Sequence, residues 1–123
     1  MCSSDLQTTY TNMAQQVDLY IAKIEDLMEK EAEKIVGLDV EYTTEDASTR
    51  KAAIIQLCMG RACLVYHISA ADEACPKLAQ FLANPNISFA GVDIDNDISR
   101  LYRCNGLRVE NFVDIQQRWK PPS

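Results

Sequence analysis

Residues 34–43, KIVGLDVEYT, decide how this chain folds. Most of them are β-branched, aromatic or bulky aliphatic, which favours a buried β-strand. Asp39 and Glu41 interrupt the run and, being two positions apart, leave a strand from the same face. Two carboxylates held close together in a half-buried place repel each other unless a cation lies between them, and a hard divalent metal ion suits such oxygen donors. An ordinary half-exposed strand that carries both acids into water explains the same pattern.

Length and composition describe a single globular domain. The chain has 123 residues, of which 47% are hydrophobic and 24% charged. The net charge of −6 argues against a protein that holds nucleic acid through a broad basic face, because phosphate binding needs clustered Lys and Arg. The N-terminus has neither the basic start nor the apolar block of a signal peptide, and no apolar run is long enough to span a membrane. We therefore expect an intracellular protein, nuclear or cytoplasmic, with no membrane partner.

The cysteines and the single histidine form no recognisable metal or disulfide pattern. The number of cysteines is odd, and no Cys-x-x-Cys pair or Cys/His cluster occurs. We expect reduced, mostly buried small side chains at all of them. His67 has no partner at metal-ligand spacing, so a packing or surface role is favoured over catalysis. The cysteines are Cys2, Cys58, Cys63, Cys75 and Cys104.

Hydrophobic periodicity predicts a helix followed by the order β-β-β-α-β-α-β. Apolar residues at spacings of three and four over residues 12–34 predict an amphipathic helix. Three apolar runs joined by short polar links then predict an antiparallel meander, and each of the two later helices leads into a short strand. The predicted strands are 34–43, 51–59, 62–68, 86–91 and 107–113, and the later helices are 73–83 and 93–105.

These elements predict an α/β fold of the ribonuclease-H-like type. Right-handed crossovers place the fourth strand beside the first, giving a mixed five-stranded sheet of order 3-2-1-4-5. Both crossover helices should then lie on one face of the sheet, and the added N-terminal helix could cover part of the other. The predicted organisation is an N-terminal segment with its helix at 1–33, the domain at 34–115 and a tail at 116–123.

Sequence motifs on these elements support a family resemblance. VGLDVEYT at 36–43 carries two acids on the first strand, and AGVDIDNDISRL at 90–101 carries a third, Asp97, on a helix. AAIIQLCMG, ACLVYHIS and NFVDIQ match the second, third and fifth strands. Residues 33–114, about two-thirds of the chain, thus resemble the 3′-5′ exonuclease domain of the DEDD superfamily, most closely the Werner-syndrome-exonuclease-like proteins of plants.

The resemblance implies a catalytic metal site made by Asp39, Glu41 and Asp97. Without the resemblance, the favourable interaction of acids with the positive end of a helix dipole explains Asp93, Asp95 and Asp97, and no catalytic role is required. In the family, the third acid joins the first two, and the cluster binds two divalent cations that activate water and stabilise the breaking phosphodiester. The expected cofactor is Mg²⁺ or Mn²⁺, bound weakly if at all.

The sequence departs from the family after the fifth strand. Complete domains continue through further helices to a Tyr-x-x-x-Asp motif, which supplies a fourth acid and a tyrosine that orients the attacking water. No such motif follows Asp97, since Gly106 stands four residues after Tyr102. Asp114 lies on the predicted fifth strand and is not expected to replace the missing acid. Without the C-terminal helices, one sheet face should stay uncovered and present an interface.

Three hypotheses follow. The favoured one is a truncated, catalytically inactive exonuclease-like domain that acts as a protein-interaction module, binding another protein or a second copy through the uncovered sheet face. The alternative is a weak metal-dependent 3′-5′ exonuclease that uses Asp39, Glu41 and Asp97 on nucleic-acid ends. The third is a partial product with no role of its own. Even without activity, the acids should bind Mg²⁺ or Mn²⁺ weakly.

Overall fold

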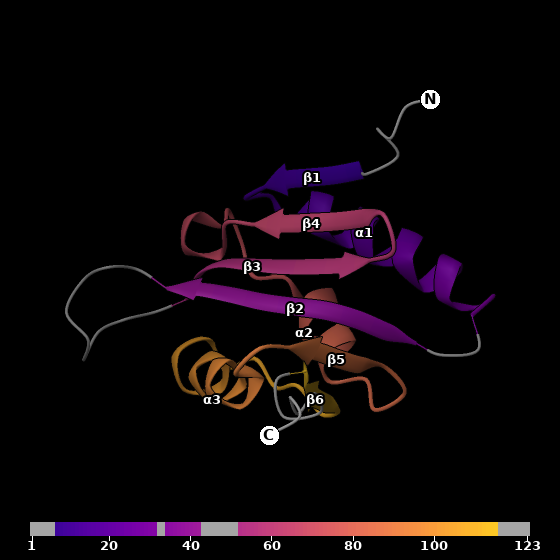
Figure 1. The fold of residues 1–123 in the computed structure, drawn as a ribbon. Helices are drawn as coiled ribbons and strands as arrows, with labels where there is room; N and C mark the ends of the chain where they lie inside the picture. Colours follow the sequence, from indigo (N-terminus) through magenta and orange to yellow (C-terminus); the bar gives the residue numbers. More distant parts are fainter. Residues whose placement is uncertain (1–6, 32–33, 43–51, 116–123) are drawn as a thin grey trace, which may run out of the picture.

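A mixed β-sheet forms the centre of the protein. The computed structural model describes residues 7–31, 34–42 and 52–115 (Figure 1). None of the helices in these ranges is long and apolar enough to cross a membrane. The elements are β1 (Gln7–Thr11), α1 (Ala14–Met28), β2 (Ile35–Tyr42), β3 (Ala52–Met59), β4 (Ala62–Tyr66), the 3₁₀ turn η2 (Ile68–Ala70), α2 (Pro76–Leu82), β5 (Ser88–Gly91), α3 (Ile94–Asn105) and β6 (Phe112–Asp114).

The strand order is β1-β4-β3-β2-β5-β6. Strands β2, β3 and β4 form an antiparallel meander, while β5 pairs parallel with β2 and with β6. The order β4-β3-β2-β5-β6 is the predicted 3-2-1-4-5 arrangement, so the ribonuclease-H-like fold class is confirmed. The tail predicted at 116–123 lies outside the described residues.

The sheet has a sixth strand that the sequence analysis did not predict. Strand β1 pairs parallel with β4 at the edge of the sheet, with Thr9 in register with Leu64. Its sequence, QTTYT, is short and has no apolar alternation, but threonine and tyrosine fit a pleated surface once a neighbouring strand is present. The segment at 1–33 therefore contributes to the same sheet as the rest of the chain.

Helix α1 packs over the β3–β4 hairpin. It begins at Ala14 and ends at Met28, so it is shorter than the predicted 12–34. The buried Tyr20 hydroxyl donates hydrogen bonds to the carbonyl oxygens of Leu57 at 3.2 Å and Ala62 at 2.8 Å. At the first turn, the Ala14 amide donates to Asp72 Oδ1 at 2.9 Å. A side chain distant in sequence thus supplies the acceptor that usually comes from a local N-cap.

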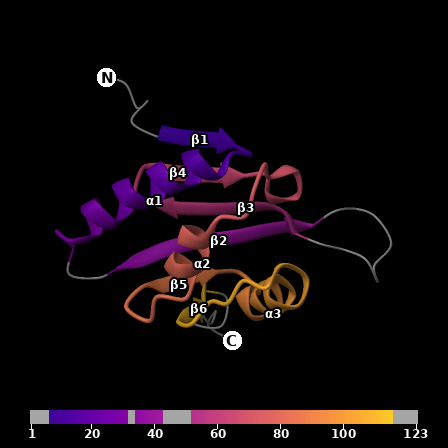
Figure 2. The same ribbon diagram turned by 180° about the vertical axis from the view of Figure 1, so that it is seen from behind.

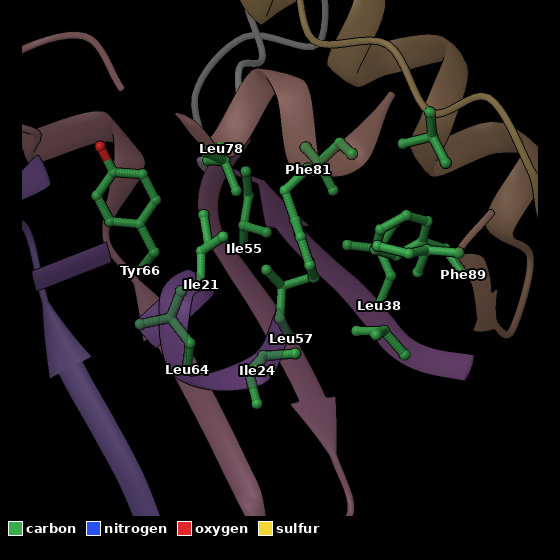
Figure 3. Packing of buried hydrophobic residues seen from close by; sticks show 14 of the residues in the cluster. Ile21, Ile24, Leu38, Ile55, Leu57, Leu64, Tyr66, Leu78, Phe81 and Phe89 are labelled. Carbon is green, nitrogen blue, oxygen red and sulfur yellow. The ribbon is translucent and has the colours of Figure 1, made fainter. Parts of the chain in front are cut away.

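All three α-helices lie on one face of the sheet. The sheet lies in front of α1 and α2 in Figure 1, and these helices come to the front when the molecule is turned (Figure 2). A single cluster of buried side chains joins the sheet to α1, α2 and α3, and Figure 3 shows Leu38 and Leu57 of the sheet among Ile24 of α1 and Phe81 of α2. The predicted common face of the two crossover helices is confirmed.

The opposite side of the sheet, here called the open face, has no helix of the described residues on it. The expectation that the N-terminal helix covers part of it is wrong, because α1 buries its apolar stripe beside α2 in the common core. The open face is formed by the side chains that alternate with the buried ones. They include Ile35, Asp39 and Glu41 of β2, Cys58 of β3, Cys63 and Val65 of β4, and Ala90 of β5.

Gly91 allows β5 to approach β2 closely before the chain turns into α3. A Cβ atom at this position would lie 2.5 Å from the Leu38 carbonyl oxygen and 3.5 Å from Ile94 Cδ1. The first of these atoms belongs to the backbone of the central strand, so it cannot move aside as a flexible side chain would.

Gly91→Ala is expected to lower the free energy of unfolding by about 1–3 kcal/mol, because β2 and β5 must separate to admit the methyl group. Urea denaturation measures the loss. Gly37→Ala is the matched control on β2, since its Cβ would make only ordinary contacts, the nearest at 3.6 Å from the Cys58 carbonyl oxygen. Equal losses of unfolding free energy in Gly91→Ala and Gly37→Ala would show that the close approach of β5 to β2 at Gly91 does not cause the destabilisation.

Candidate functional site

Strand β2 displays Asp39 and Glu41 on the open face. Burial alternates along the strand: Val36, Leu38 and Val40 are buried against the helices, and the two acids are exposed. In the β2–β3 ladder, Asp39 lies opposite Gln56 and Glu41 opposite Ile54. The predicted strand and the common face of the two acids are therefore confirmed. The register shifts between Glu41 and Tyr42, which ends the regular pairing.

A second group of side chains connects the end of β2 to α3. The Tyr42 hydroxyl donates a hydrogen bond to Asp97 Oδ1 at 3.0 Å. The Arg100 guanidinium carbon lies 4.9 Å from the centroid of the Tyr42 ring, a cation–π distance. Asp97 and Arg100 are three positions apart and so share one side of the helix. The sequence analysis did not identify Tyr42 or Arg100 as site residues. For Arg100, its spacing of three positions from Asp97 was a signal that could have indicated this role.

The Asp97 carboxyl lies in an environment that disfavours its ionised form. Burial raises its pKa, and the negative charges of Asp39 and Asp93 raise it further. The hydrogen bond from Tyr42 and the charge of Arg100 act in the opposite direction. The hydrogen bond from Tyr42 to Asp97 places this acid of α3 at the end of β2, the strand that carries Asp39. This pair of acids concentrates negative charge that a cation would neutralise.

The expected three-carboxylate metal cluster is not assembled. In residues 7–31, 34–42 and 52–115, no three acidic, histidine or cysteine side chains are grouped so that they could hold a metal ion. Glu41 lies exposed on the open face and is not among the charges that shift the pKa of Asp97. Three carboxylates repel one another when no cation lies between them, and the Tyr42 hydroxyl already donates a hydrogen bond to one Asp97 oxygen. The carboxylates are nevertheless the ligand type that Mg²⁺ and Mn²⁺ take.

Asp114 is the one polar or charged residue that is buried in the described part of the chain. It ends β6 and lies in register with Gly91 of β5. The sequence analysis gave it no metal-binding role. The strand predicted at 107–113 is wrong over 107–111, since β6 spans Phe112–Asp114. The structure adds its burial, which the alternation of a three-residue strand could not indicate.

A hollow of about 380 Å³ opens beside Asp39. It borders both β2 and β5, and among the described residues that line it Asp39 is the only charged one. No helix of residues 7–31, 34–42 and 52–115 lies between this carboxylate and the open face. The hollow is lined mainly by Gly37, Asp39, Gln56, Cys58, Ala90 and Ile115.

Sequence comparison identifies the family. A family model described as 3′-5′ exonuclease matches residues 14–119. The chain is also 32% identical over 84 residues to the mouse (Mus musculus) bifunctional 3′-5′ exonuclease/ATP-dependent helicase WRN, an alignment that covers 66% of this chain and 6% of the mouse protein. These matches agree with the predicted resemblance to Werner-like exonucleases.

Comparison with solved structures gives the same fold. The EXD2 exonuclease domain superposes with a TM-score of 0.80 at 17% identity, covering 91% of this chain and 58% of that chain. For EXD2 crystals soaked in Mn, the TM-score is 0.78 at 18% identity, with 90% and 56% covered. For those soaked in Mg, it is 0.78 at 17% identity, with 90% and 57% covered. The chain thus spans a little over half of these solved domains.

The family match extends over every helix and over β2 to β6, the elements that carry both acid-bearing motifs. The solved structures, at these low identities, support the fold alone. Because the family model covers residues 14–119, more than half of the sequence, this chain belongs to the DEDD-type 3′-5′ exonuclease family, and the mouse relative and the shared fold agree with that membership.

Proposed function

We propose that this chain is a divalent-metal-dependent 3′-5′ exonuclease domain that acts weakly on nucleic-acid ends. Asp39 and Asp97 are its principal cation ligands, and Glu41 is the third donor. The observation that carries the proposal is the hydrogen bond from the Tyr42 hydroxyl to Asp97 Oδ1 at 3.0 Å, which joins the end of the strand that carries Asp39 to α3. Their positions in the two acid-bearing motifs support it, and so does the soaking of the related EXD2 crystals with Mn and Mg.

Each side chain of the site has a distinct part in this proposal. Asp39 and Asp97 bind the cation through carboxylate oxygens, and Glu41 leaves β2 on the same face as Asp39. The Tyr42 hydroxyl orients the Asp97 carboxylate by its hydrogen bond to Oδ1. Arg100 holds the Tyr42 ring by its cation–π contact. A divalent cation supplies Lewis-acid stabilisation of the phosphodiester and lowers the pKa of an attacking water.

The described residues explain why the proposed activity is weak. They contain no group of three acidic, histidine or cysteine side chains suited to holding a metal ion, so the cation site is only partly formed. The net charge of −6 also disfavours binding of a polyanion without a cation between protein and phosphate. Hydrolysis should therefore depend steeply on the metal concentration.

Degradation of 5′-labelled DNA and RNA by the purified chain is expected to give a ladder of 3′-shortened products with Mn²⁺ or Mg²⁺. Asp39→Ala should reduce the rate on the order of 100-fold, because a ligand is lost. Asp95→Asn is the matched control: Asp95 is exposed in the first turn of α3 and should leave the rate unchanged. A rate in Asp39→Ala equal to that of the parent would falsify the assignment.

Melting temperature should report cation binding without any need for catalysis. Millimolar Mn²⁺ is expected to raise it by roughly 4 °C at a tenfold excess over Kd. Asp97→Asn should melt at a higher temperature than the parent without metal, because it removes a carboxylate whose ionisation is unfavourable yet keeps an Oδ1 acceptor for Tyr42. Its response to Mn²⁺ should shrink, while Asp95→Asn responds like the parent.

The melting temperature of Glu41→Gln with and without Mn²⁺ tests whether Glu41 binds the cation together with Asp39 and Asp97. A smaller Mn²⁺ response than that of the parent is expected if Glu41 binds the cation. An unchanged response would limit the site to Asp39 and Asp97, and unchanged responses in all the variants would remove the metal site altogether.

The open face favours a second candidate function, a catalytically inactive protein-interaction module. A hollow of about 520 Å³ between β2, β5 and β6 shares Ala90 and Ile115 with the hollow beside Asp39. Ile35 and Ile115 at these hollows are 49% and 50% exposed. Apolar side chains gathered in adjoining hollows are typical of an interface. A second copy of the chain is the simplest partner, because it presents the same face.

Self-association through the open face is expected to appear as a concentration-dependent dimer in sedimentation experiments. Ile35→Lys should weaken the dimer by at least about tenfold, because it introduces a charge into the apolar contact. Leu19→Lys is the matched control, since Leu19 is 60% exposed on α1, away from the open face. A monomer at every concentration, or equal weakening by both changes, would rule out this dimer.

A further inference from the structure

Two thiols on the open face have no part in the proposed nuclease chemistry. Cys58 of β3 and Cys63 of β4 lie directly opposite each other in the antiparallel ladder. Their register is set by a tight turn: Met59 pairs with Ala62, and Gly60 between them has a φ of 58°, which a glycine adopts without strain. The pairing is therefore a fixed feature of the hairpin.

The spacing of directly opposite residues suits a disulfide bond. Their Cα atoms are roughly 4.5–5.5 Å apart in an antiparallel pair, and disulfides join Cα atoms roughly 4.4–6.8 Å apart. Both side chains leave their strands on the open face, directly opposite each other. A bond between the sulfurs thus requires side-chain rotation with little movement of the backbone.

The pair is accessible to a small oxidant. Neither thiol is fully buried, and Cys58 lies opposite Gly37 of β2, which has no side chain to cover it. Cys58 also lines the hollow of about 380 Å³ beside Asp39. A molecule the size of hydrogen peroxide can enter this hollow.

We propose that Cys58 and Cys63 form a redox modification site, at which hydrogen peroxide closes a cross-strand disulfide and low-molecular-weight thiols reopen it. One sulfur attacks the peroxide, breaking the O–O bond and giving a sulfenic acid and one water. The other sulfur attacks that sulfenic sulfur, forming the S–S bond and releasing a second water. Two thiols and one peroxide thus give one disulfide and two waters, and two small thiols reverse the change by forming their own disulfide.

Cys58 and Cys63 are free thiols in the structure. Burial, together with the interaction with Cys63, raises the pKa of Cys58 to about 12. Because the thiolate is the reactive form, Cys58 reacts more slowly than a catalytic cysteine. The site therefore responds to sustained rather than brief exposure to oxidant. It does not depend on the proposed nuclease function.

The test is peroxide treatment of the full chain, followed by alkylation of the remaining thiols and non-reducing peptide mapping. Cys75→Ser serves as the parent for mapping, because Cys63 and Cys75 otherwise share a tryptic peptide, whereas cleavage after Arg61 separates Cys58 from Cys63. Cys75 lies elsewhere, with its Sγ 3.2 Å from Asp18 Oδ1. The expected result is loss of two hydrogen atoms, a linked Cys58–Cys63 peptide pair, and recovery of both thiols with dithiothreitol.

A relocated pair provides the matched geometric control. Cys63→Ser combined with Val65→Cys keeps two thiols on the same face but places them diagonally, about 7–8 Å apart, beyond ordinary disulfide reach. It should form at least about tenfold less intramolecular disulfide than the parent. Equal yield from this variant overturns the proposal, and so does a parent that forms mainly bonds between chains, bonds to other cysteines, or over-oxidised thiols.

Discussion

The structure depends on the burial of one face of β2. Val36, Leu38 and Val40 are buried against the helices in the middle of the sheet, with β3 on one side and β5 on the other. A slip of one residue would expose this row and bury Asp39 and Glu41, which no partner in the core could compensate. The hydrophobic effect on one side of the strand thus determines where the acids of the other side lie.

The candidate site depends on the placement of α1, α2 and α3 on one face of the sheet. Helix α3 packs into the common core through Ile94 and Leu101, and this packing brings its first turn to the end of β2. There Asp97 meets Tyr42 and the charge of Asp39, while Glu41 stays in solvent. The result is a partly buried acid whose pKa is raised by burial and by the charges of Asp39 and Asp93.

The open face combines three kinds of chemistry within one layer of side chains. It carries the carboxylates of Asp39 and Glu41, the exposed side chains of Ile35 and Ile115, and the facing thiols of Cys58 and Cys63. Membership of an exonuclease family defines the scaffold, and the chemistry depends on which of these groups is used. One residue of each group lines the hollow beside Asp39, namely Asp39, Cys58 and Ile115.

The sequence by itself determined the strand and helix types, the sheet order and the common face of Asp39 and Glu41, because side-chain alternation and right-handed crossovers are local rules. It did not reveal β1, whose threonines are stabilised only by pairing with β4. Only the tertiary structure decided that α1 lies beside α2, so that no helix of the described residues covers the open face, and that Tyr42 donates a hydrogen bond to Asp97. These outcomes depend on packing and on the balance of like charges between segments far apart in the chain, which no local pattern encodes.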